Sequence, residues 1–69
     1  MNDNAKFTII LNKLSIMISE LNIKISKDPE NAELKEKLED VISDRELLYT
    51  GTREDLENII IKYGVSIDE

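Results

Sequence analysis

The sequence contains no cysteine, no histidine and no tryptophan among its 69 residues. Without cysteine and histidine the chain can form neither disulfides nor the usual structural zinc sites, and it lacks the groups that Cys and Ser–His nucleophiles require. Two glycines and one proline occur, and neither glycine belongs to a phosphate-binding loop. We therefore expect no cofactor, no metal and no enzymatic activity.

The remaining composition is that of one small folded domain spanning residues 1–69. Hydrophobic residues make up 41% of the chain, which is enough for a packed core although 35% of the residues are charged. A core of this size supplies only about 3–5 kcal/mol of stability. Because disulfides and the usual zinc sites are excluded, self-association or docking onto another protein is the expected additional source of stability.

Neither a targeting signal nor a membrane-spanning segment is evident in the sequence. Residues 1–4 lack the basic start of a signal peptide. The most apolar stretch is too polar to cross a bilayer, since Asn12, Lys13, Glu20, Asn22 and Lys24 interrupt it. We expect a cytoplasmic protein without a membrane partner, and the abundance of Ile, Asn and Lys indicates a bacterial or phage origin.

A seven-residue repeat runs from Phe7 to Lys27. The first, fourth and fifth positions of each repeat are mostly apolar and share one face of a helix at about 100° per residue. The repeat predicts an amphipathic helix over about residues 5–26. The alternative is a pair of strands, because residues 14–18 and 21–25 also alternate apolar and polar side chains, but no turn residues separate them.

A second helix is predicted at about residues 29–49, because residues 27–30 form a break and a helix start. Asp28 is the expected N-cap, and Pro29 suits the first helical position because its missing N–H needs no partner there. The inward stripe of this helix is Leu34, Leu38, Val41, Ile42 and Leu48. The matched lengths of the two helices and the tight turn between them predict an antiparallel hairpin.

A short third helix is predicted at about residues 53–63. Gly51 is expected to adopt the left-handed conformation that commonly ends a helix. Thr52 followed by Asp55 resembles a capping box, in which each residue binds a backbone N–H of the other. The inward residues of the third helix are Leu56, Ile59, Ile60 and Tyr63.

The third helix is expected to end at Gly64. Val65 is expected to fold back onto Ile60, and the end of the chain, residues 65–69, is expected to form a frayed tail. Together these elements predict an all-α fold. It consists of an antiparallel helical hairpin plus a short third helix, assembled as a homodimeric helical bundle.

One apolar row of the first helix is not needed for the internal core. The third positions of the repeat are Ile9, Ile16 and Ile23, which lie nearly opposite the face that packs on the second helix. Burying each isoleucine stabilises a structure by about 1.5–3 kcal/mol relative to exposure. We predict that this row is a self-association or partner-binding face; the alternative is that the third helix covers it.

Charge is distributed unevenly along the chain. Residues 28–57 carry a net charge of −7, whereas residues 1–27 carry +2. The acidic middle argues against direct nucleic-acid binding, which needs a basic face. The candidate acidic docking face is Glu36, Glu39, Asp40 and Asp44. The alternative is that these side chains are exposed surface charge that keeps the protein soluble.

Three functions follow from these features as hypotheses. The first is a small non-enzymatic regulator or adaptor that acts through helix packing, with itself or another protein as partner. The second is an acidic inhibitor of the phage or mobile-element kind, which docks on a basic protein or mimics nucleic acid towards it; its binding would weaken steeply with salt. The third is a structural assembly subunit, which would grow beyond a dimer.

Overall fold

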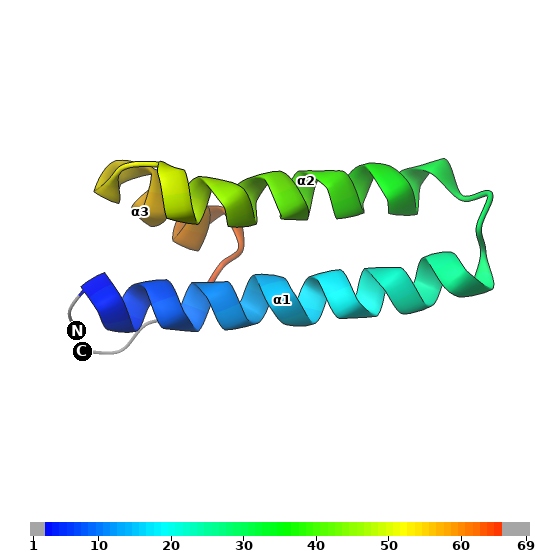
Figure 1. The fold of residues 1–69 in the computed structure, drawn as a ribbon, viewed down its shortest axis with the longest axis horizontal. Coiled ribbons are helices and arrows are strands. Elements are labelled where there is room, and N and C mark those ends of the chain that lie inside the picture. The colour runs from blue at the N-terminus through cyan, green and yellow to red at the C-terminus, as the bar shows by residue number, and fades with distance from the viewer. Residues whose placement is uncertain (1–2, 66–69) are drawn as a thin grey trace.

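A computed structural model describes residues 3–65 of the chain. Over that range the fold is all-helical, with three helices and no strand. The helices are α1 (Asp3–Lys27), α2 (Ala32–Thr50) and α3 (Arg53–Lys62). The two long helices lie side by side, and α3 packs where α1 begins and α2 ends (Figure 1).

Helix α1 is a single uninterrupted helix of 25 residues. The segments 14–18 and 21–25 both lie inside it, so the two-strand alternative is wrong. The helix also includes Asp3 and Asn4, which precede the predicted start, while residues 1–2 lie outside the described range. Lys24 and Lys27 occupy the last turn, where positive charge interacts favourably with the helix dipole.

The turn between α1 and α2 differs from the prediction. The N-cap of α2 is Asn31, not Asp28, and its side-chain oxygen accepts the N–H of Leu34 at 3.2 Å. Asp28 instead accepts the side-chain amide of Asn31 at 3.1 Å. Pro29 therefore lies in the turn and not in the helix. The physical reason is that the Asp28 carboxylate orients the Asn31 amide, which leaves the Asn31 oxygen aimed at the helix.

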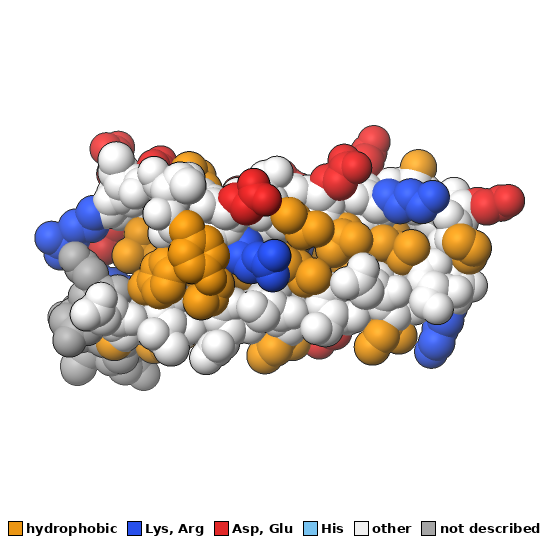
Figure 2. Space-filling view, viewed as in Figure 1, with side chains coloured by type: hydrophobic (Ala, Val, Ile, Leu, Met, Phe, Trp, Pro, Cys, Tyr) orange, Lys and Arg blue, Asp and Glu red, His pale blue; other side chains and the backbone are white. Residues whose placement is uncertain are grey.

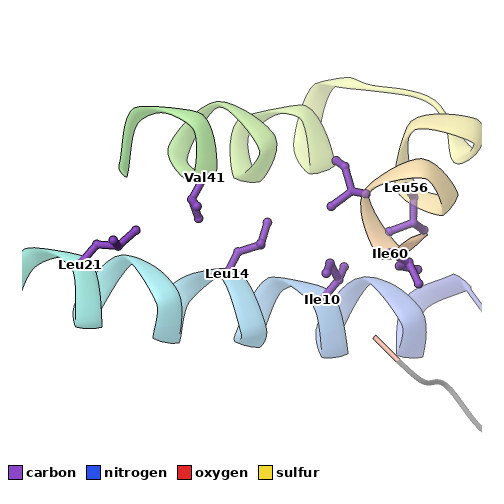
Figure 3. Packing of buried hydrophobic residues seen from close by; sticks show 7 residues of the cluster. Ile10, Leu14, Leu21, Val41, Leu56 and Ile60 are labelled. Atoms are coloured by element: carbon purple, nitrogen blue, oxygen red, sulfur yellow. The ribbon is translucent and has the colours of Figure 1, made fainter. Parts of the chain in front are cut away.

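The core lies between the three helices, and each helix contributes to it. From α1, Ile10, Leu14 and Leu21 point towards α2 and α3 (Figure 3). These positions share one helical face, as the sequence repeat predicts. The buried residues are Ile10, Leu14, Leu21, Val41, Leu56, Ile59 and Ile60. Half-buried side chains packed against them are Met17, Ile18, Leu34, Leu38, Leu48, Tyr63 and Val65.

The connection between α2 and α3 needs a glycine, but not for the predicted reason. Gly51 has φ −87° and ψ −173°, so it is extended and not left-handed. A Cβ at this position would lie 2.6 Å from both the Leu47 carbonyl oxygen and the Asp55 carboxylate. The predicted capping box is confirmed: the Asp55 N–H donates to the Thr52 hydroxyl at 3.3 Å, and the Thr52 N–H donates to the Asp55 carboxylate at 2.9 Å.

Helix α3 ends in a Schellman motif, a pair of hydrogen bonds that closes the last turn. Gly64 is left-handed, with φ +65°, and its N–H donates to the Ile61 carbonyl at 3.1 Å. The Val65 N–H donates to the Ile60 carbonyl at 3.2 Å, and the Val65 side chain packs against the core. The fold-back of Val65 is thereby confirmed, and the prediction that the frayed tail includes Val65 is wrong. Residues 66–69 of the predicted tail lie outside the described range.

Candidate interaction surface

The predicted apolar row lies on the outer side of α1, away from α2. Ile16 and Ile23 are 59% and 57% exposed, and Ile9 is half-buried. The three residues are seven apart, so they follow one line along the helix. Hydrophobic side chains are visible along the edge of the molecule that α1 forms opposite α2 (Figure 2). We call Ile9, Ile16 and Ile23 the outer row.

Helix α3 leaves Ile16 and Ile23 of the outer row exposed. Its inward residues, Leu56, Ile59 and Ile60, belong to the same core cluster as the inner face of α1. An ion pair between Lys6 Nζ and Glu57 Oε1 at 3.1 Å also holds α3 to the beginning of α1. The alternative in which α3 covers the row is therefore excluded for Ile16 and Ile23, which stay largely exposed.

The two edges of the outer row differ in chemistry. One edge carries the charged residues Lys13, Glu20 and Lys27, each four positions after an isoleucine of the row. The other edge carries small neutral polar residues three positions after each isoleucine. They are Asn12, Ser19 and Ser26, and all six edge residues are exposed. The surface is thus an apolar line with one charged side and one uncharged side.

The predicted acidic face is divided between solvent and the interior of the fold. Glu36, Glu39 and Asp40 are exposed, but the Asp44 side chain is only 15% exposed. Asp44 accepts Lys62 Nζ at 2.8 Å and the Tyr63 hydroxyl at 2.5 Å. Asp40 accepts the same lysine at 3.2 Å. The expectation that Asp44 is exposed surface charge is wrong, because its carboxylate helps to hold α3 against α2.

We call Asp40, Asp44, Lys62 and Tyr63 the Asp44 cluster. The hydrogen bond that Lys62 donates to Asp44 raises the pKa of Lys62. Partial burial, together with the hydrogen bond to Asp44, raises the pKa of Tyr63. Both groups therefore keep their protons to a higher pH than an ordinary lysine or tyrosine does. Local spacing could not predict this cluster, because its contacts join positions 18 to 22 residues apart.

A second aromatic contact lies where α1 begins. The rings of Phe7 and Tyr49 meet edge to face, with centroids 5.5 Å apart. The Tyr49 side chain is 65% exposed. Beside this pair is an open hollow of about 210 Å³, smaller than the roughly 300–1,000 Å³ of typical ligand sites. It is lined by Asn4, Phe7, Leu48, Gly51, Thr52, Arg53 and Leu56.

Within residues 3–65 there is neither a helix suited to span a membrane nor a cluster of metal-ligating side chains. No helix there combines the length and the apolar character needed to cross a bilayer. Likewise, no group of three or more acidic side chains in that range is arranged to hold a metal ion.

Comparisons with known proteins do not place this chain in a family. No protein-family model matches it, and no curated protein and no solved structure is significantly similar to it.

Proposed function

We propose that this chain is a small non-enzymatic protein–protein interaction module that acts in the cytoplasm through the outer row of α1. In this proposal α1 and α2 form an antiparallel hairpin, α3 closes one end of it, and two chains associate as a homodimeric bundle. The supporting observation is that Ile16 and Ile23 are 59% and 57% exposed on a helix whose opposite face already fills the core.

The energetic argument rests on the small size of the internal core. Seven hydrophobic residues are buried in the described range, and cores of such small domains supply only about 3–5 kcal/mol. Burying an exposed isoleucine contributes about 1.5–3 kcal/mol before the entropic costs of association are subtracted. Covering the outer row is therefore comparable in magnitude with folding itself, which favours association through this face.

Solution mass tests the proposal. Size-exclusion chromatography with light scattering is expected to give wild type as a dimer of the 7.9 kDa chain. Ile16→Glu places a charge in the outer row and is expected to give a monomer with unchanged helix content by circular dichroism. The matched control is Ile61→Glu, at a position 75% exposed on α3, which is expected to stay dimeric. A monomeric wild type, or a dimeric Ile16→Glu, would contradict self-association.

The exposed acids of α2 favour a second candidate function, an acidic inhibitor that docks on a basic protein. Glu36 and Glu39 are exposed, whereas Asp40 and Asp44 bind Lys62. The double variant Glu36→Lys with Glu39→Lys therefore removes surface charge without disturbing α3. If this function holds, the variant loses salt-sensitive binding to proteins that a heparin column retains from a bacterial extract. Equal binding by wild type and variant would exclude it.

A further inference from the structure

We infer that the occupant of the outer row is a second copy of this chain, with its α1 antiparallel to the first. This inference rests on the proposed function and adds the orientation and the contacts of the partner. It starts from three exposed features of α1: the apolar residue Ile16 near its middle, and the opposite charges Lys13 and Glu20 on the same edge.

A two-fold axis through Ile16 brings like faces together. In an antiparallel pair, two positions meet when their residue numbers sum to about 32. Ile16 then meets Ile16 of the second copy, and Ile9 meets Ile23. A contact of this kind is isologous: each copy uses the same patch, and the assembly closes at two chains.

The same axis pairs opposite charges. Lys13 of one copy lies opposite residue 19 of the other, one residue from its Glu20. The charged edges of both helices face the same side of an antiparallel pair, so Lys13 of each copy reaches Glu20 of the other. Two reciprocal ion pairs result, whereas Lys27 lies opposite Lys6, whose charge Glu57 of its own chain already pairs at 3.1 Å. On the uncharged edge, Asn12 meets the small side chain of Ser19, which lets the helices approach closely.

A parallel arrangement lacks this complementarity. In register, it brings the charged edge of each helix against the uncharged edge of the other, so Lys13 lies beside Asn12, Glu20 lies beside Ser19, and no ion pair forms. It also aligns the two helix dipoles, whereas antiparallel dipoles attract. A head-to-tail contact with the acidic side of α2 is less favourable, because it does not close at two chains and because Lys62 already pairs with Asp40 and Asp44. Charge thus selects the antiparallel pair.

Charge reversal tests the orientation, with sedimentation equilibrium to measure dimer dissociation. A seam one helix wide lies at the small end of protein interfaces, so a micromolar dissociation constant is expected. In the antiparallel dimer, Lys13→Glu opposes Glu with Glu twice, and Glu20→Lys opposes Lys with Lys twice. Each variant alone is expected to dimerise about tenfold more weakly than wild type.

An equimolar mixture of Lys13→Glu and Glu20→Lys is the decisive sample, because a heterodimer of the two restores both ion pairs. It is expected to dimerise as tightly as wild type. The matched controls Lys35→Glu and Glu36→Lys make the same charge changes at exposed positions of α2 and are expected to leave dimerisation unchanged. Unaffected single variants, a mixture that fails to dimerise, or growth beyond a dimer would overturn the antiparallel pair. A monomeric wild type would instead reject the proposed function.

Discussion

Replacing Tyr63 with phenylalanine isolates one interaction that holds α3 to α2. The Tyr63 hydroxyl donates to Asp44 at 2.5 Å, and its half-buried ring packs against the core. The substitution keeps the ring and removes only the hydroxyl. Asp44 retains Lys62 as a partner at 2.8 Å, so the carboxylate is not left alone. The change in stability of this variant therefore measures mainly the loss of the Tyr63–Asp44 hydrogen bond.

The magnitude follows from the charge and the burial of the pair. A hydrogen bond to a charged group contributes about 1.5–3 kcal/mol to stability. Because Asp44 also binds Lys62, and because Asp44 and Tyr63 are only partly buried, the expected contribution lies near or just below the lower end of this range. We expect Tyr63→Phe to lower the free energy of unfolding by about 1–2 kcal/mol, a large part of the roughly 3–5 kcal/mol available to so small a core.

Urea unfolding followed by circular dichroism measures this loss. The chain concentration is held fixed, since dimerisation changes the apparent stability. Tyr49→Phe is the matched control: the Tyr49 side chain is 65% exposed, and its ring contact with Phe7 survives the change. The control is expected to alter stability by less than about 0.5 kcal/mol. Equal losses in the two variants would refute the role assigned to the Tyr63 hydroxyl.

Three further outcomes can be checked by the same unfolding measurements. Leu14→Ala, at a fully buried position, is expected to lower the free energy of unfolding by about 2–5 kcal/mol. Leu47→Ala, at a position 37% exposed, is expected to lower it by less than about 1 kcal/mol. Similar losses in the two variants would contradict the described core. Gly51→Ala is expected to lower the free energy of unfolding by about 1–2 kcal/mol, because the new Cβ displaces the capped start of α3. An unchanged stability would contradict the need for glycine between α2 and α3. The raised pKa values of Lys62 and Tyr63 stabilise the fold fully below pH 10.0, the ordinary tyrosine pKa. This stabilisation is lost as the pH rises further. The Tyr63→Phe variant is expected to lose less stability at alkaline pH than wild type. An equal loss in the variant and in wild type would contradict this assignment.

Periodicity in the sequence was sufficient to sort the two faces of α1. Ile10, Leu14 and Leu21 are buried, whereas Ile16 and Ile23 are exposed, as a helical repeat of seven requires. The reason is that side-chain direction in a helix depends on position alone. The core side of α1 and the outer row were therefore predictable before any tertiary contact was known.

The exact start of α2 was not predictable in the same way. Asp28 and Asn31 are both good N-caps by residue type, and Pro29 after Asp28 favoured the earlier position. The outcome depends on a hydrogen bond between the two side chains, which requires the geometry of the whole turn. The capping box at Thr52 was predictable because both partners lie within one helical turn.

The Asp44 cluster shows the limit of local reasoning about charge. Asp40 and Asp44 are four residues apart on α2 and resemble ordinary surface acids. Their partners, Lys62 and Tyr63, are brought to them by the fold of α3. The number of acids on α2 therefore overstated its free negative charge, and only the structure separates exposed Glu36 and Glu39 from the carboxylates that hold α3.

Cysteine cross-linking tests most directly whether the outer row contacts a second chain. Ile16→Cys supplies a single thiol, because the chain has no cysteine of its own, and a disulfide forms only when two Cα atoms come within about 7 Å. We predict that Ile16→Cys oxidises rapidly to a covalent dimer at micromolar concentration. Ile61→Cys, at a position 75% exposed, is predicted to do so only slowly. Equal, slow oxidation of both variants would contradict the account.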